Sequence, residues 1–470
     1  MCSFLDFKRQ ISEIFYQKLF KLNFKKFLIK SIVSGSQSFL SISISRHCIF
    51  ANMNYDVVVI GGGAAGFFTA INLAKQNQEL SVVIVERGAQ VLEKVKISGG
   101  GRCNVTHAIF EPKPLTENYP RGQRELLGPF HTFLSGDTIA WFEERGVPLK
   151  IEDDGRMFPE SNSSQTIIDC FLEEAKIYNV EIKTKWPVIN IENEGNNWKL
   201  QSKNEKLNCK VVVVATGSNP KMLSLLQNKG IAITRAVPSL FTFNIKDKRI
   251  NELAGLSTLA EVSLEIPAEL NAKKKAYLNQ NLKYISGPVL ITHWGMSGPG
   301  ILKLSAWGAR ILNELDYKFN LCVNWLPDFE SEVLHEQLRD YKVELAKQTL
   351  HKWSPFDLPK RLWQNLLNAS GVNHEKKWAD ITKIDIENLV KQLQNGIFQV
   401  DGKSTFKEEF VTAGGVNLKE IDFKTYQSKQ HTNLYLVGEV LDIDAVTGGF
   451  NFQSAWTGGF IAANAIANNF

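Results

Sequence analysis

Residues 55–87 read YDVVVIGGGAAGFFTAINLAKQNQELSVVIVER. An apolar run at 57–60 leads into three glycines spaced G-x-G-x-x-G, a helix-like segment follows, and a second apolar run at 82–85 precedes an acidic residue. A buried strand, a glycine turn, a helix and a second strand in this order form a unit that binds a dinucleotide. The stretch therefore predicts an α/β fold with a Rossmann-like domain.

The three glycines and the acid have separate roles in such a unit. Gly61 allows the tight turn, Gly63 lets the backbone approach a pyrophosphate, and Gly66 lets the helix pack close to the strand. The amino terminus of the helix would face the phosphates with free N–H groups and a partial positive charge. Glu86 can accept hydrogen bonds from a ribose with a free 2′-hydroxyl, which favours FAD or NAD over NADP.

Length and composition bound the class of protein. The 470 residues are enough for two or three domains. The sequence has no run of 18 consecutive apolar residues, so no transmembrane helix is expected. The net charge of +5 comes from residues 1–52, which carry eight basic and two acidic residues, so the rest of the chain is near neutral. Without a basic field, we expect a small-molecule substrate and no nucleic-acid partner.

Residues 1–52 are rich in Lys, Phe, Ile and Ser and poor in acids. Such a composition is typical of a targeting leader or of a basic segment on a membrane surface. Met53 lies just before the first strand, where chains of this type begin. We therefore favour the interpretation that residues 1–52 are a basic extension outside the native fold.

The six cysteines form no C-x-x-C pair and no Cys/His cluster with zinc spacing. This usage predicts no metal site and fits a reducing, cytoplasmic location. Cys103 has no partner cysteine nearby in the sequence, so we interpret it as a small neighbour of the cofactor rather than as a redox group.

Further cofactor signals follow along the chain. The glycine-rich segment 97–107, ISGGGRCNVTH, offers backbone N–H groups, a guanidinium and an amide at Gly100, Arg102 and Asn104, which suit a pyrophosphate and the polar edge of a flavin. Val188 is expected on a strand whose main chain pairs with adenine. Thr216 and Gly217 end a buried strand beside the expected path of the nucleotide, and all three residues also suit a plain sheet core.

A second strong signal lies near the C-terminus, where a strand at 434–437 precedes GEVLDIDAVTGGFNFQSAW. Gly438 follows the strand, and one of the next three carboxylates is expected to hold the ribityl hydroxyls of a flavin. These carboxylates are Glu439, Asp442 and Asp444.

The glycine pair that ends at Gly449 should start a helix in the same segment. The positive end of this helix would stabilise negative charge on a reduced flavin. Asn451 and Gln453 are placed to hydrogen-bond the ring, and the alternative is a small-residue helix packed on the sheet.

For two motifs in the middle of the chain, the sequence leaves two possible roles open. His293, Trp294 and Ser297 lie in a glycine-rich turn that forms either a substrate wall or a structural junction, and a lone histidine is more often structural. Ser297 is also a candidate cap for a helix starting near Ile301. Arg156 points either toward an anionic ligand or into a salt-bridged turn.

The chain has no second G-x-G-x-x-G after a strand between residues 100 and 400. NAD(P)H would therefore have to dock transiently, or another donor serves, and the single fingerprint belongs to a tightly held cofactor. We predict a discontinuous FAD-binding domain, residues 53–236 and 405–470, in which the strand at 434–437 returns to the first sheet. Residues 116–182 are expected to be mainly helical, with a polar turn at 153–156. An inserted β-barrel-like and helical region is expected at 237–404, with short strand runs over residues 237–290.

With both ends considered, residues 53–470 resemble the BaiN/YhiN-like flavoproteins, also described as NAD(P)/FAD-dependent or aminoacetone-oxidase-like enzymes. The motifs that carry the resemblance are VVVIGGGAAG at 57–66, ISGGGRCNVTH at 97–107, DGRMFPES at 154–161, THWGMSGPGIL at 292–302, TAGGV at 412–416 and GEVLDIDAVTGGFNFQSAW at 438–456. The resemblance implies FAD contacts at Gly61, Gly63, Ala65, Gly66, Glu86, Arg87, Arg102, Cys103, Asn104, Val188, Gly438, Glu439 and Asn451.

The segment ATGSNPKMLSLLQNKG at 215–230 departs from the longer Gly/Ser-rich loop of many members, so contacts there are expected to differ. We expect an FAD-dependent oxidoreductase that moves hydride through the flavin, with no side chain standing out as acid or base. The alternatives are a flavin-binding redox sensor without turnover and a flavin-dependent RNA-modifying protein, against which the near-neutral charge counts.

Overall fold

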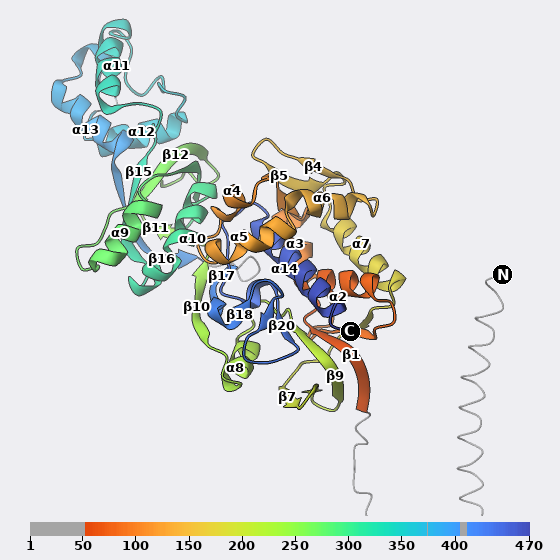
Figure 1. Ribbon diagram of the computed structural model, residues 1–470. Helices are drawn as coiled ribbons and strands as arrows, with labels where there is room; N and C mark the ends of the chain where they lie inside the picture. The colour runs from red at the N-terminus through yellow and green to blue at the C-terminus, as the bar shows by residue number, and fades with distance from the viewer. Residues whose placement is uncertain (1–51, 374, 405–410) are drawn as a thin grey trace, which may run out of the picture. The chain divides into compact units, whose positions relative to one another are not determined.

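The computed structural model describes residues 52–470 apart from 374 and 405–410 (Figure 1). The prediction for residues 1–52 lies outside the described residues except for Asn52, at which the first strand begins. Among the described residues, no helix is both long and apolar enough to cross a membrane.

A mostly parallel sheet forms the centre of the first region (Figure 1). Its parallel strands follow the order β20-β9-β1-β2-β6, with bounds Leu434–Leu436, Lys206–Val214, Asn52–Ile60, Val82–Val85 and Glu181–Lys183. Antiparallel strands extend this sheet at two places. Beyond β20 lie β19 (Gln427–Ser428) and β18 (Ile421–Asp422), and β8 (Asn197–Gln201) pairs with β9 and with β7 (Asn190–Glu194). The return of the C-terminal strand to the first sheet, predicted from sequence, is confirmed because β20 pairs with β9.

Two helices from opposite ends of the chain lie side by side on this sheet, α2 (Ala64–Gln76) and α14 (Phe450–Ala467) (Figure 1). They approach closely because α14 carries Gly459, where a Cβ would lie 3.0 Å from Thr69 Oγ1. Beside them, Phe68 and Trp456 pack with ring centroids 5.2 Å apart. The glycine turn after β1 and the C-terminal glycine segment are thereby held in one layer of the fold.

Residues 116–182 are mainly helical, as expected, but together with residues 106–107 they also form a small sheet that the sequence did not predict. The sheet has the order β3-β5-β4, with strands Thr106–His107, Arg156–Pro159 and Leu149–Ile151. The helices of this segment are α4 (Pro112–Thr116), α5 (Gln123–Thr132), α6 (Ser135–Glu143) and α7 (Ser164–Ile177). The polar turn before Arg156 is therefore a hairpin loop rather than a helix connection.

The inserted region contains a closed barrel with the order β11-β14-β13-β12-β15-β16. Its strands are Thr242–Ile245, Gly295–Ser297, Ile285–Thr292, Ser257–Leu264, Lys318–Asn324 and Gly396–Ser404, and α10 (Pro299–Glu314) packs on them. The chain reaches the barrel through β10 (Ile233–Ser239), after α8 (Pro220–Asn228), and returns through β17 (Val411–Val416). The two linking strands pair with each other.

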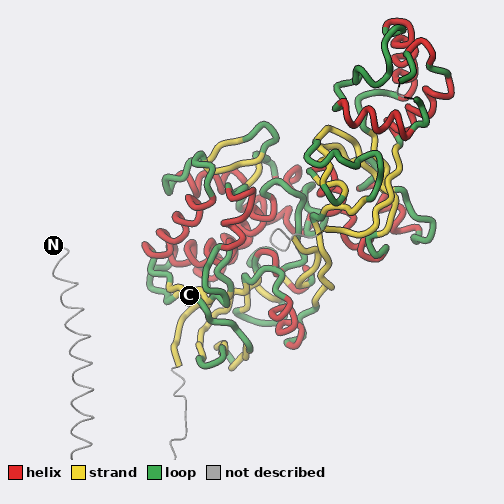
Figure 2. The backbone as a smooth tube through the Cα atoms, turned by 180° about the vertical axis from the view of Figure 1, so that it is seen from behind, coloured by secondary structure: helices red, strands yellow, loops and turns green. Residues whose placement is uncertain are grey.

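A small helical part follows the barrel strand β15. It comprises α11 (Ser331–Glu344), α12 (Lys360–Ala369), the short η1 (Trp378–Asp380) and α13 (Lys383–Gln394), drawn in red beside the yellow barrel strands in Figure 2. Its apolar side chains join the barrel core, which is separate from the core around the parallel sheet. The α/β class with a Rossmann-type domain and an inserted barrel is thus confirmed, whereas the limits 53–236, 237–404 and 405–470 stay a prediction.

Four local expectations differ from the structure. Helix α9 (Ala272–Asn281) replaces part of an expected strand run, because Asn271 caps it and Lys and Ala favour helix over strand. Helix α3 (Glu93–Gly101) occupies part of the expected glycine loop, with non-helical dihedrals at its glycines. Val188 lies in the connection between β6 and β7, not on a strand. Helix α10 begins at Pro299 after Gly298, so Ser297 does not cap it.

Candidate cofactor and substrate site

A cavity of about 1260 Å³ opens along the carboxyl ends of β1, β2, β9 and β20. Open α/β sheets bind their ligands at this position. The residues proposed from sequence that line it are Gly61, Gly63, Ala65, Glu86, Arg87, Gly100, Asn104, Thr216, Gly217, Gly438, Glu439, Gly449 and Asn451. The fold thus brings the fingerprint, the second glycine segment and the C-terminal motif to one cavity.

The glycines of the fingerprint differ in what surrounds them. At Gly61, whose φ is +113°, a Cβ would lie 2.4 Å from Ala215 O, and at Gly66 a Cβ would lie 2.0 Å from Gly61 O. At Gly63 a Cβ would meet no protein atom within 4 Å. Gly61 and Gly66 are therefore required by the protein itself, whereas Gly63 faces open space suited to a pyrophosphate.

Glu86 is held in place by the backbone of the turn. Its Oε2 accepts a hydrogen bond from Gly62 N at 2.9 Å, and its Oε1 accepts one from Gly88 N at 2.7 Å. A carboxylate has about four acceptor positions, so two remain for the hydroxyls of a ribose. This geometry fits the adenosine end of a dinucleotide.

The N-terminus of α14 forms the other end of the cavity. Gly449 precedes the helix with φ +89°, and a Cβ there would lie 2.6 Å from Thr106 O. In the amide orientation that satisfies both of its side-chain atoms, Asn104 donates to Thr106 O and accepts from Gly449 N, both at 3.0 Å, which ties the second glycine segment to this helix start. Helix N-termini favour negative charge, so this end suits the oxygen edge of a reduced flavin.

Two of the three C-terminal carboxylates serve other contacts. Both carboxylate oxygens of Asp442 lie 2.6 Å from Arg310 Nη2, and Asp444 is buried against Arg121. Asp442 was a candidate cofactor contact, but it lies outside the cavity lining, where Glu439 remains. Sequence spacing could not separate the three because their partners lie more than a hundred residues away.

Four other candidate residues have partners within the protein, and of these only Arg156 lines the cavity. Cys103 is completely buried, and burial raises the pKa of its thiol to about 12, so it carries no thiolate for redox chemistry. Gln453 is also buried, accepts hydrogen bonds from Thr106 and Thr138, and does not line the cavity. Arg102 stacks on Phe158 and pairs with Glu152. Arg156 pairs with Asp154 and Glu152 and also lines the cavity.

The barrel supplies the wall opposite the sheet. His293, Trp294 and Ser297 all line the cavity, together with Thr242 and Leu302. Thr242 Oγ1 donates to Ser297 Oγ at 2.9 Å. The glycine-rich turn is therefore a barrel junction that also lines the cavity, and its role as a substrate wall stays a prediction.

The HI0933-like protein Rossmann domain matches residues 55–465. The chain belongs to this family of flavoproteins. A similar relative is the ribosomal RNA dihydrouridine synthase of Haemophilus influenzae, 30% identical over 87% of this chain and 98% of that protein. The Escherichia coli protein of that name is 26% identical, covering 87% and 97%. The 3-dehydro-bile acid delta(4,6)-reductase of Clostridium scindens is 24% identical, covering 87% and 98%.

Membership of the HI0933-like family confirms the resemblance drawn from the motifs and identifies the chain as an FAD-dependent oxidoreductase. The residues present fit FAD on structural grounds. An open position at Gly63, a fixed carboxylate at Glu86 and a helix start at Gly449 line one cavity.

Lys94 of α3 is a cavity residue that the sequence patterns did not single out. Its Nζ lies 2.6 Å from Glu439 Oε2, and both side chains lie close to the Cβ position of Gly217. An unpaired carboxylate in this cavity would repel a pyrophosphate, so Lys94 offsets that repulsion and adds a cation. In the sequence, the feature that could have indicated Lys94 as a cavity residue was its position five residues before Gly99 of the second glycine segment.

We expect Lys94→Ala to weaken FAD binding by roughly tenfold, and more at low ionic strength, because the pair is partly exposed and screened by salt. Fluorescence titration of the apoprotein with FAD measures this change. Lys96→Ala is the matched control, since Lys96 is exposed on the same helix and does not line the cavity. Equal FAD affinity in the two variants would remove Lys94 from the cofactor site.

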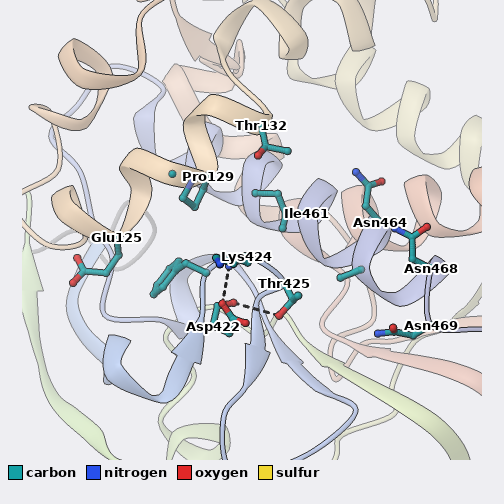
Figure 3. A pocket seen from close by; sticks show the side chains of 13 residues that line it. Glu125, Pro129, Thr132, Asp422, Lys424, Thr425, Ile461, Asn464, Asn468 and Asn469 are labelled. Carbon is teal, nitrogen blue, oxygen red and sulfur yellow. Dashed lines mark hydrogen bonds between the residues drawn. The ribbon is translucent and has the colours of Figure 1, made fainter.

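A second cavity of about 620 Å³ lies at the other end of α14 (Figure 3). Its walls include Glu125 and Pro129 of α5, Asp422 and Lys424, and Asn464 of α14. It contains none of the residues proposed from sequence. Among the described residues, no group of three His, Cys, Asp or Glu could hold a metal ion.

Proposed function

We propose that this protein uses FAD to reduce a C=C bond conjugated to a carbonyl group, and that uridine in RNA is its first candidate substrate. The observation that carries the proposal is that its full-length relatives, two ribosomal RNA dihydrouridine synthases and a bile acid reductase, share one type of reaction. Dihydrouridine forms by saturation of the C5=C6 bond of uridine, which is conjugated to the C4 carbonyl. Reduction of a 3-oxo-Δ(4,6) steroid saturates the same type of bond.

We also propose that FAD is held by the cavity-lining residues that the sequence predicted, together with Gly66, whose close contact with Gly61 supports the turn. When bound, FAD supplies the hydride-accepting and hydride-donating ring. Glu86 would orient the ribose, the amino terminus of α2 would face the pyrophosphate, and Glu439 would hold the ribityl hydroxyls. The start of α14 would stabilise negative charge on the reduced ring, which favours its reduction.

The barrel wall would hold the substrate against the flavin. Thr242 and Ser297 form a hydrogen-bonded hydroxyl pair that can turn one proton toward a carbonyl oxygen of the substrate. His293 lines the same cavity and is the candidate that donates a proton to the carbon next to the carbonyl. Leu302 and Trp294 contribute apolar surface that excludes water from the reacting face.

The electron donor proposed for this reaction is NAD(P)H, which would dock transiently because the chain has a single dinucleotide fingerprint. A nicotinamide that approaches the flavin must leave before the substrate enters. This order predicts ping-pong kinetics when the donor and acceptor concentrations are varied.

The test is an anaerobic assay of the FAD-loaded protein. The flavin is reduced with NADH or NADPH, unmodified ribosomal RNA is added, and nucleosides from the digested RNA are measured by mass spectrometry. We expect uridine to gain two hydrogen atoms while the flavin absorption returns. Uridine that stays unchanged while the flavin remains reduced would contradict RNA as the substrate.

A small enone is the second candidate substrate, favoured by the full-length similarity to the bile acid reductase and by the apolar part of the barrel wall. The same assay with a 3-oxo-Δ4 steroid in place of RNA tests it. Flavin reoxidation by the steroid and not by RNA would favour the small substrate that the near-neutral overall charge predicts.

A further inference from the structure

The charge of this chain is unevenly distributed around the cavity. The stretch from Leu270 to Asn313 contains no acidic residue, although the whole chain has 49. It forms α9, β13, β14 and α10, and it includes the cavity turn with His293 and Trp294. Its basic residues are Lys273, Lys274, Lys275, Lys283, Lys303 and Arg310.

One face of the barrel in this stretch is exposed and partly apolar. Along β13, the buried residues Ile285, Val289 and Ile291 alternate with residues that point outward, because successive side chains of a strand face opposite sides. Leu259 of β12 lies opposite the outward-facing Pro288. Leu259 is 65% exposed, and Tyr284, just before β13, is 64% exposed.

This face ends at the flavin cavity. Leu290 and Thr292 are the next outward positions of β13, and both line the cavity. Trp294 follows in the turn and is 60% exposed while lining the same cavity. From Tyr284 to Thr292 the strand runs for about 26 Å, which matches a binding track for several nucleotides.

The backbone of the turn is braced, so it presents Trp294 in a fixed position. Thr292 Oγ1 accepts hydrogen bonds from Trp294 N and Gly295 N, and Trp294 O accepts one from Ile245 N at 2.9 Å. At Gly295 a Cβ would lie 2.2 Å from Phe243 O, which fixes glycine there. An exposed tryptophan on a rigid turn offers its ring for stacking without ordering a loop on binding.

We propose that this face docks single-stranded RNA and leads the target base into the flavin cavity. The face is called the barrel strip and consists of Leu259, Lys283, Tyr284, Pro288 and Trp294. The inference rests on the proposed reduction of uridine and adds the surface that recognises the polymer. Flat bases stack on exposed aromatic rings, and lysines attract phosphates.

Charge complementarity favours RNA over a neutral partner on the barrel strip. Lys283 lies on it, with Nζ 4.9 Å from the Tyr284 ring centroid, and Lys303 is exposed beside the cavity residue Leu302. Glu261 of β12, which pairs with Ser286 of β13 near the strip, has a pKa that is raised by burial. The near-neutral total charge of the chain thus coexists with a local basic surface at the cavity.

The test uses the full-length protein loaded with FAD and a fluorescein-labelled, uridine-containing single-stranded RNA of about 12 nucleotides. Fluorescence anisotropy gives the affinity at several salt concentrations. We expect Trp294→Ala to weaken binding about 5- to 150-fold through lost stacking. Lys283→Glu combined with Lys303→Glu should lower the slope of log affinity against log salt by about 1.4, or 0.7 for each lost phosphate contact.

Matched controls lie in the helical part. Trp353→Ala removes a tryptophan that is 42% exposed, and Lys347→Glu with Lys352→Glu reverses two exposed lysines away from the barrel strip. These controls should bind RNA as the unchanged protein does. The flavin absorption spectrum of each variant shows that it is folded and loaded.

Strip variants that bind RNA as tightly as the controls overturn the docking surface. RNA binding through the strip without any reduction of uridine supports the strip and overturns the proposed substrate. Uridine reduction that survives unchanged in the strip variants supports the substrate and overturns the strip. Tighter binding of a duplex of the same sequence also overturns it, because stacking needs unpaired bases.

Discussion

Gly63→Ala gives a folded protein that has lost most of its affinity for FAD, whereas Gly66→Ala gives a protein that melts at a clearly lower temperature. The two substitutions add the same methyl group three residues apart. At Gly63 the methyl group meets no protein atom within 4 Å, and the dihedrals, φ −98° and ψ −170°, are extended and open to alanine. The cost to the protein is about 1 kcal/mol, from a poorer helix N-cap.

The same methyl group at Gly63 would stand where the pyrophosphate must approach the backbone. Loss of charged hydrogen bonds of this type costs about 1.5–3 kcal/mol, so FAD should bind about 10- to 150-fold more weakly. Thermal unfolding of the apoprotein and titration with FAD separate the two effects. A Gly63→Ala variant with unchanged FAD affinity would falsify the placement of the pyrophosphate.

At Gly66 the methyl group would lie 2.0 Å from Gly61 O, and neither the turn nor α2 can move away. Gly61 is itself blocked by Ala215 O, and α2 packs against α14 over the buried sheet. Forced overpacking of this kind costs about 3 kcal/mol or more, which lowers the melting temperature by about 6–12 °C. A Gly66→Ala apoprotein that melts with the parent would contradict this close contact.

The success of the sequence interpretation follows from local physics. The fingerprint needs a tight turn, an open position and a close helix contact within ten residues. Its glycines therefore predict the strand, the turn and the helix together. The return of β20 was also predictable, because a buried strand before a glycine segment has few places to pair. The fingerprint depends only on neighbours in the sequence, whereas the return of β20 joins distant segments, with Leu434 opposite Val212.

The features that sequence did not predict depend on distant partners. Gln453 follows a glycine segment of the kind that binds flavin, yet its side-chain oxygen already accepts hydrogen bonds from the hydroxyls of Thr106 and Thr138. Asp442 and Glu439 are both carboxylates of one segment, and only the fold places Arg310 against the first and Lys94 against the second. The acid-free stretch 270–313 can be read in the sequence, but only the fold places it beside the cavity, and the total charge does not describe this local surface.

Arg121→Met destabilises the protein by about 3–5 kcal/mol at neutral pH, which lowers its melting temperature by about 6–20 °C. Arg121 forms a buried ion pair with Asp444, whose side chain is completely inaccessible, and it also donates to Ala306 O and Ser239 Oγ. The guanidinium thus joins the segment before α5, the end of β10, α10 and the C-terminal motif. Methionine keeps most of the volume but leaves the carboxylate buried without a partner.

The pH dependence of this loss identifies its cause. Burial raises the pKa of Asp444 even beside Arg121, whose charge opposes the shift. Without Arg121 the folded protein favours the protonated acid still more, so the penalty grows as the pH rises above the carboxyl pKa of the unfolded chain and shrinks as the pH falls toward it. Melting curves of Arg121→Met should therefore approach those of the parent as the pH is lowered toward 5 and diverge toward 7.5.

Arg310→Met is the matched control for Arg121→Met. Arg310 also pairs with a carboxylate of the C-terminal motif, Asp442, but its side chain is 42% exposed, so solvent screens the pair and its loss should cost about 1 kcal/mol or less. Arg121→Met combined with Asp444→Leu should recover much of the stability, because it removes the unpaired charge along with the pair. If the double variant is as unstable as Arg121→Met alone, the cost lies in the hydrogen bonds from Arg121 to Ala306 and Ser239, and the buried charge is not its source.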